Sequence, residues 1–174
     1  MICKDLSRFY SLKRGLSDIR IQCILTLRNP IMRVYLDNCC FNRPFDDQSQ
    51  ARIRLEAEAK LEIQQRIKGR KIELAWSYIL EHENQANPFE ERRDVIDGWK
   101  KTAIIDIEEA PEILHQAREI ADRGIRAKDA LHIACAIAAE CKFFLTTDDV
   151  LAKKMTGFSG IIVIDPTRFI IEVT

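Results

Sequence analysis

Short apolar runs alternate with amphipathic segments from Met32 to the carboxyl end of the chain. The apolar runs are typical of strands, and the segments between them favour helices. Near-continuous apolar strands suit a parallel sheet that is covered on both faces. The alternation therefore predicts one α/β domain, a three-layer α/β/α sandwich around a central, mostly parallel sheet. The expected strands are residues 34–36, 72–76, 102–107, 143–146 and 161–164.

The longest expected helix precedes the second strand and ends near Ile67, with Gly69 as its C-cap. Polar side chains of the kind that cap helices stand just before it. Apolar residues recur at every fourth position along it, so we expect them to form one buried stripe. The capping candidates are Asp46, Asp47 and Ser49, and the stripe is Ala51, Leu55, Ala59, Ile63 and Ile67.

The first thirty residues differ from the rest because they are basic and lack clear periodicity. They carry six Lys or Arg and two Asp, a net charge of +4, so the remainder carries −4. We expect a basic N-terminal extension at residues 1–31, followed by the functional domain at residues 32–174. The extension is either a mobile segment or upstream sequence wrongly included in the reading frame.

Composition excludes several classes of protein. The net charge of zero argues against tight, nonspecific coating of DNA, which depends on neutralising phosphates. The six cysteines have no zinc-ligand spacing, which favours buried thiols in a reducing compartment. No apolar stretch approaches the ~20 residues that a membrane span needs. We therefore expect a cytoplasmic protein with no membrane association.

Acidic residues stand where the expected strands end. Asp37 follows the first strand, and Asp148 comes just after residues 143–146. Glu81 and Glu83 lie on the helix after the second strand, and Asp129 lies in the first turn of an Ala-rich helix near residues 128–141. Ligands bind outside the carboxyl ends of strands in such sheets. The spacing therefore predicts that these acids approach one another there.

Several carboxylates that converge from separate elements repel one another, so such a cluster normally exists for cations. Carboxylate oxygens suit Mg²⁺ or Mn²⁺. These ions activate water and stabilise the leaving oxygen when a phosphodiester is hydrolysed. The acidic residues therefore predict a metal-dependent hydrolase of phosphate esters.

Four segments resemble, in order, the acidic motifs of the PIN-domain family, which includes VapC-type toxins. The resemblance covers about residues 32–164, and its most specific part is Asp-Ala-Leu-His-Ile-Ala followed by Thr-Thr-Asp. It implies an α/β/α sandwich, dependence on Mg²⁺ or Mn²⁺, and cleavage of single-stranded RNA. It also implies a homodimer and an antitoxin partner, since many members are toxins of toxin–antitoxin pairs. The segments are Leu36-Asp37-Asn38, Ser77 to Glu83, Lys128 to Ala134, and Leu145 to Asp148.

The resemblance assigns catalytic and metal-binding roles to one acid in each motif. Glu81 competes with Glu83 in the second motif, and the spacing from Ser77 favours Glu83. Supporting roles fall to Asn38 and Thr146, through an amide and a hydroxyl. Arg43 is the expected phosphate contact, because it lies closer to Asp37 in sequence than the basic clusters at residues 66–71 and 92–93. The four assigned acids are Asp37, Glu83, Asp129 and Asp148.

Simpler interpretations exist for single residues. Asp129 could serve only the dipole of its helix, and Asp149 is the expected cap of the short helix that follows it. His132 is expected to be a packed, hydrogen-bonded histidine, and the Arg92-Arg93 pair is either a solvated surface or a guide for RNA.

The alternative function is a non-catalytic PIN-like module that binds RNA or a protein. A phosphoacceptor domain is disfavoured because no early Asp-Asp pair ends a strand, and an Asp-x-Asp phosphatase is disfavoured because the first strand is followed by Asp37-Asn38-Cys39.

Overall fold

The computed structural model describes residues 31–173, so the prediction for the N-terminal extension lies almost wholly outside the described residues. Within them, five parallel strands form one sheet in the order β3-β2-β1-β4-β5. The strands are β1 (Arg33–Leu36), β2 (Glu73–Ser77), β3 (Ile105–Ile107), β4 (Phe143–Leu145) and β5 (Ile162–Ile164). The predicted strands are therefore present at nearly the predicted positions.

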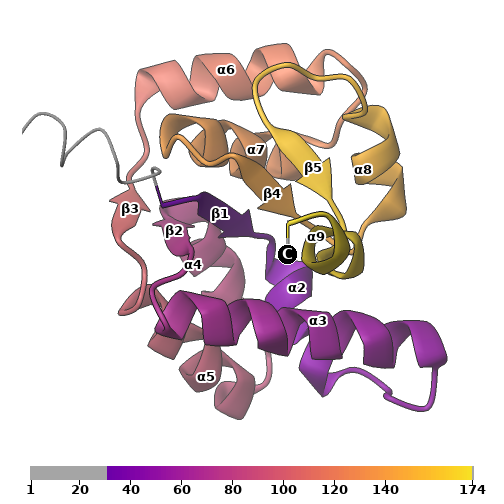
Figure 1. Ribbon diagram of the computed structural model, residues 1–174. Coiled ribbons are helices and arrows are strands. Elements are labelled where there is room, and N and C mark those ends of the chain that lie inside the picture. Colours follow the sequence, from indigo (N-terminus) through magenta and orange to yellow (C-terminus); the bar gives the residue numbers. More distant parts are fainter. Residues whose placement is uncertain (1–30, 174) are drawn as a thin grey trace, which may run out of the picture. The chain divides into compact units, whose positions relative to one another are not determined.

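Helices cover both faces of this sheet. Helices α6 (Pro111–Ala121) and α7 (Ala127–Ala138) pack together on one side, and α3 (Ala51–Lys68) with α9 (Pro166–Glu172) lies on the other (Figure 1). This arrangement confirms the predicted α/β/α sandwich. The remaining helices are α2 (Asn38–Asn42), η1 (Arg43–Phe45), α4 (Tyr78–Gln85), α5 (Glu90–Lys100) and α8 (Asp149–Lys154).

The register of the central strands sets the level at which each one ends. Tyr35 of β1 lies beside Ala75 of β2, and Leu36 lies beside Leu145 of β4. The residues of β1 from Val34 to Leu36 and all of β4 are buried. The positions that follow, Asp37 and Thr146, are therefore neighbours at the carboxyl edge.

The stripe predicted for α3 is wrong in its first half. Leu55 is 57% exposed, whereas Glu56 and Lys60 are buried. A strict four-residue repeat drifts by about 40° per step around a helix of 3.6 residues per turn, so its first members turn to solvent. Glu56 instead lies 2.8 Å from Arg43 Nε and 2.7 Å from Arg52 Nε, which compensates its burial.

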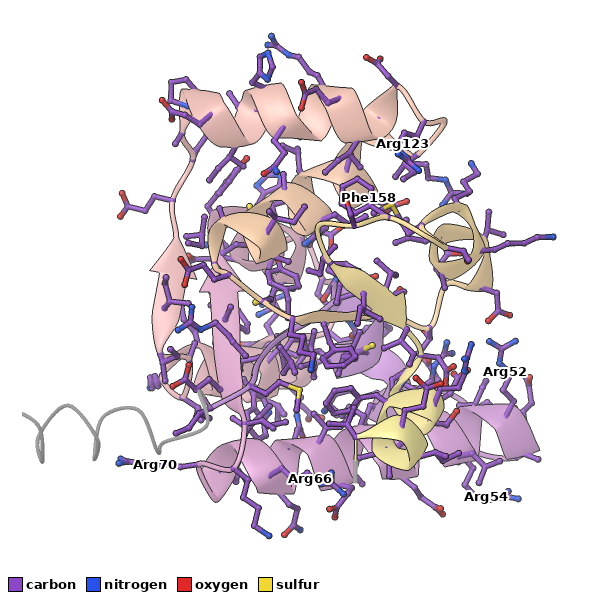
Figure 2. The ribbon with its side chains drawn as sticks, turned by 45° about the horizontal axis from the view of Figure 1, so that its top comes forward. Arg52, Arg54, Arg66, Arg70, Arg123 and Phe158 are labelled. Carbon is purple, nitrogen blue, oxygen red and sulfur yellow. The ribbon has the colours of Figure 1, made fainter. Side chains whose placement is uncertain are left out.

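The ends of α3 fulfil the prediction only in part. Gly69 is the C-cap as expected, but the N-cap is Gln50, with no side-chain hydrogen bond to the helix. Asp47 instead accepts hydrogen bonds from the backbone N and the Oγ of Ser49. Figure 2 shows arginines along this helix, with Arg52 near its first turns.

None of the helices in residues 31–173 combines the length and apolarity required to cross a bilayer.

Candidate active site

Asp37 is held at the carboxyl edge of the sheet by contacts on one side of its carboxylate. Its backbone N donates to the carbonyl of Leu145 at 2.9 Å. Its Oδ2 accepts from Thr146 Oγ1 at 2.8 Å and from Cys39 Sγ at 3.2 Å. Asp37 precedes α2 but makes no side-chain capping bond to it. Within residues 31–173, Oδ1 has no hydrogen-bond partner, so it is available to a ligand.

Glu83 and Glu81 point to different surroundings from α4. Glu83 Oε2 lies 2.9 Å from His132 Nε2, and Oε1 lies 3.0 Å from Lys128 Nζ. Glu81 instead pairs with Lys100 at 2.5 Å, and Lys100 also lies 3.3 Å from Asp106. Ligand atoms of Asp37, Glu83 and His132 all lie within 4.8 Å of one another. The structure therefore brings Glu83, and not Glu81, to Asp37.

Burial and ionic contacts act in opposite directions on Glu83. Burial alone would raise the pKa of its carboxyl, because the charged form loses hydration. Hydrogen bonds from His132 and Lys128, together with the positive charge of Lys128, outweigh this effect and lower the pKa overall. Glu83 is therefore held as a carboxylate, which is the form that accepts hydrogen bonds and binds cations.

A buried chain of hydrogen bonds orients Glu83. His132 is 1% exposed, and its Nδ1 lies 2.8 Å from the hydroxyl of Tyr35, which lies 2.6 Å from Ser77 Oγ. Because a carboxylate only accepts, His132 Nε2 donates to Glu83, and Nδ1 of the neutral ring then accepts from Tyr35. Burial raises the pKa of Tyr35 well above its ordinary value, which keeps this hydroxyl a donor. Sequence reasoning expected a hydrogen-bonded His132 but missed Tyr35.

Ser77 completes the chain at the start of α4. Its Oγ accepts from the backbone N of Leu80, as a helix N-cap does, so its hydroxyl proton is free to serve Tyr35. Ser77 is thus the N-cap of α4. The chain Ser77–Tyr35–His132–Glu83 thus links β2, β1, α7 and α4 through donors that all point towards the carboxylate.

We expect Tyr35→Phe to lower the free energy of unfolding by about 2 kcal/mol, because it leaves the buried His132 Nδ1 and the hydroxyl proton of Ser77 without a partner. The phenyl ring would still stack on Phe144, whose ring centroid lies 5.4 Å away. Urea unfolding followed by circular dichroism measures the change. Tyr78→Phe is the matched control, because the buried Tyr78 hydroxyl has no partner among residues 31–173. Equal costs for the two variants would contradict the role of the chain.

Asp129 and Asp148 line a neighbouring pocket that also contains Arg126 and Lys154. Burial raises the pKa of Asp129, and the charges of Asp37 and Asp148 raise it further. Asp37 and Asp148 are therefore close enough to disfavour the ionised form of Asp129. Within residues 31–173, the Asp129 carboxylate has no hydrogen-bond partner.

Asp148 follows β4, where one carboxylate oxygen caps the next helix and the other is left for the site. Its Oδ1 accepts from the backbone N of Val150 at 2.8 Å and of Leu151 at 3.0 Å, so Asp148 is the N-cap of α8. The expectation that Asp149 is the cap is therefore wrong. Asp149 is the first residue of the helix, and its carboxylate is bound by Arg52 at 2.6 Å. The capping bonds fix the orientation of Asp148 and leave its Oδ2 for the site.

The expected supporting residues differ in their placement. Thr146 Oγ1 donates to Asp37 and accepts from the backbone N of Asp148 at 3.1 Å, so it joins the two acids. Asn38 accepts from Asn42 Nδ2 through its amide oxygen at 3.1 Å. Arg43 pairs with Glu56 at 2.8 Å and Asp46 at 3.1 Å, so its guanidinium is engaged towards α3. Cys39, which donates to Asp37, was not foreseen.

Fold and site together define a parallel α/β protein with a cluster of acidic residues, at the carboxyl edge of its sheet, that could hold a metal ion. The family model of the PIN domain matches residues 34–155, a span that includes all four acids. The chain belongs to the PIN-domain family. No curated protein matches the chain.

The chain is also similar to a solved structure, the crystal structure of VapBC2 from Rickettsia felis bound to a DNA fragment from their promoter. The two are 14% identical, with a TM-score of 0.48. The match covers 77% of this chain and 98% of that chain.

Proposed function

We propose that this protein is a metal-dependent endoribonuclease that hydrolyses phosphodiester bonds of single-stranded RNA. The observation that carries the proposal is the convergence of acids from four separate elements at one edge of the sheet. Ligand atoms of Asp37 and Glu83 lie within 4.8 Å of each other, and burial together with the charges of Asp37 and Asp148 raises the pKa of Asp129. Membership of the PIN-domain family supports the same chemistry.

The donor set fits a hard divalent cation. Carboxylate oxygens are the ligands that Mg²⁺ and Mn²⁺ prefer. The oxygens of Asp37, Asp129 and Asp148 that lack partners would hold the ion, and Glu83 would bind it or position its water. Burial and the charges of Asp37 and Asp148 raise the pKa of Asp129, and a bound cation would oppose both effects. Bound there, such an ion would supply a water of lowered pKa and neutralise charge on the leaving oxygen.

The chain's own residues keep the acids in place for this chemistry. Thr146 and Cys39 hold one oxygen of Asp37, and the capping bonds to α8 hold one oxygen of Asp148. His132 restricts the rotation of Glu83 from the buried side. Preorganised ligands of this kind spare the reaction the cost of ordering them.

We expect removal of divalent metal to abolish cleavage. Purified protein incubated with labelled single-stranded RNA and Mn²⁺ should produce discrete fragments, and EDTA should stop the reaction. Excess Mn²⁺ should then restore it. The activity must follow the protein peak across a size-exclusion column, which controls for contaminating nuclease. RNA binding without cleavage in Mn²⁺ or Mg²⁺ would favour the alternative, a non-catalytic binding module.

The family resemblance also supports a biological context. We propose that the protein acts as the toxin of a toxin–antitoxin pair, as a homodimer, in the cytoplasm. Induced expression should arrest growth, and co-expression of a small neighbouring gene product should relieve the arrest. A monomeric mass by light scattering at micromolar concentration would count against the dimer.

A further inference from the structure

We propose that Phe45, Phe89 and Arg92 form a stacking site for an unpaired base of single-stranded nucleic acid, beside the acidic site. The inference rests on the proposed function, because it assigns a binding site for the substrate of that reaction. The Arg92-Arg93 pair is a candidate guide for RNA on sequence grounds, and the structure supplies Arg92 with two aromatic neighbours.

Two exposed rings flank the Arg92 guanidinium. Phe89 is 55% exposed and Phe45 is 36% exposed, although both are large apolar side chains. The guanidinium carbon of Arg92 lies 4.3 Å from the centroid of the Phe89 ring and 5.3 Å from that of Phe45. Arg92 Nη2 also donates to the backbone O of Phe45 at 3.2 Å, which fixes the guanidinium between α5 and η1. The three side chains thus form one exposed aromatic and cationic cluster.

The charge of Arg92 is not neutralised by a neighbouring acid. Within residues 31–173, no carboxylate lies within ion-pairing distance of it, although Glu90 and Glu91 precede it on the same helix. Three arginines of this part of the chain pair with acids, Arg43 with Glu56, Arg52 with Asp149, and Arg66 with Glu62, whereas Arg92 is among those that do not. A free cation held against exposed rings is the combination that binds single strands, since bases stack on the rings and the guanidinium attracts the backbone.

Hydrogen bonds between amide side chains join this cluster to the acidic site. Asn42 Nδ2 donates to the side chain of Asn38, which directly follows Asp37. Asn87 Nδ2 donates to Asn42 Oδ1 at 3.0 Å, and Asn87 Oδ1 accepts from the backbone N of Phe89 at 3.1 Å. The segment that carries Phe89 is therefore fastened to the segment that carries Asp37.

The connecting elements are short. Helix α2 has five residues and η1 has three, so the chain advances at most roughly 14 Å from Asp37 to Phe45. That span corresponds to a few nucleotides of an extended strand. A strand with one base stacked on Phe89 or Phe45 would place a nearby phosphodiester at the acids. Stacking tolerates every base, so the site would select unpaired strands over duplex without selecting sequence.

Fluorescence anisotropy with a short labelled oligouridylate tests the proposal, with Ca²⁺ in place of Mn²⁺ and the oligonucleotide checked for intactness on a gel. We expect Phe89→Leu to weaken binding roughly 5- to 30-fold, the effect of losing one stacked base. Phe89→Trp should retain binding, because it restores an aromatic face. Oligothymidylate should show the same loss with Phe89→Leu, since stacking does not require the 2′-hydroxyl.

Arg92→Gln has a matched control on another part of the molecule. Arg123 lies over the Phe158 ring at 5.2 Å, near the end of α6 and away from α3 (Figure 2). We expect Arg92→Gln to weaken binding severalfold and Arg123→Gln to leave it unchanged. An oligonucleotide of abasic sugar-phosphates should bind more weakly and should lose the difference between wild type and Phe89→Leu, which separates stacking from attraction to phosphate.

Several results would overturn the stacking site. The first is that Phe89→Leu binds oligouridylate as tightly as the wild type does. The second is that Phe89→Leu weakens binding of the abasic oligonucleotide as much as binding of oligouridylate. The third is that the wild-type protein does not bind oligouridylate. The cleavage assay with Mn²⁺ reports separately on the nuclease. Weakened binding by Phe89→Leu without cleavage by the wild type would keep the stacking site and remove the nuclease, whereas cleavage with unchanged binding would do the reverse.

Discussion

Asp37→Asn is expected to reduce Mn²⁺-dependent RNA cleavage by on the order of 1,000-fold or more, because it removes a charged metal ligand from a site whose acids act as a unit. The fold should survive the change. Asp37 makes no side-chain cap to α2, and an Asn oxygen can still accept from Thr146. Initial rates on labelled single-stranded RNA measure the loss, and a thermal melt checks that the variant is folded.

Asp149→Asn is the matched control for this loss. Asp149 directly follows the predicted metal ligand Asp148, but its carboxylate is exposed and bound by Arg52. An exposed ion pair contributes little to stability, so the control should fold and cleave like the wild type. Undiminished cleavage by Asp37→Asn would remove Asp37 from the catalytic site. Equal losses in both variants would point to a general effect of charge.

The placement of the acids could be predicted from sequence because it follows from one rule about parallel sheets. Asp37 and Asp148 each come just after an apolar run, and strand ends meet at one edge. Two runs of apolar residues therefore define where both side chains lie without any knowledge of packing. The register of β1 against β4 then brings Thr146 to Asp37.

Contacts that depend on packing between distant segments could not be predicted in this way. Tyr35 lies in the middle of an apolar strand and appears to be a core residue in sequence, yet its hydroxyl meets Ser77 and His132, 42 and 97 positions away. Such bonds depend on strand register and helix rotation together. The prediction of the buried face of α3 was wrong in part for a related reason. A periodic pattern cannot show that Arg43 and Arg52 compensate the charge of a buried Glu56.

Glu83→Gln and Glu81→Gln should have very different effects on the rate of RNA cleavage, because α4 directs the two acids to different surroundings. We expect Glu83→Gln to lower the rate of RNA cleavage by on the order of 100-fold or more, since it removes charge from the cation site. The hydrogen bond from His132 would remain, because the amide oxygen of Gln accepts as the carboxylate does. Helix α4 and its buried contacts should therefore persist, which a thermal melt can verify.

Glu81→Gln is expected to change the rate by less than about twofold, since half-exposed ion pairs such as Glu81 with Lys100 contribute little even to stability. Titration of Mn²⁺ against each variant by calorimetry gives a second measurement that does not depend on cleavage. Glu83→Gln should weaken Mn²⁺ binding, and Glu81→Gln should not. The reverse pattern would make Glu81 the acid of the second motif and would require α4 to turn by about half a revolution, because the two positions are about 200° apart on a helix.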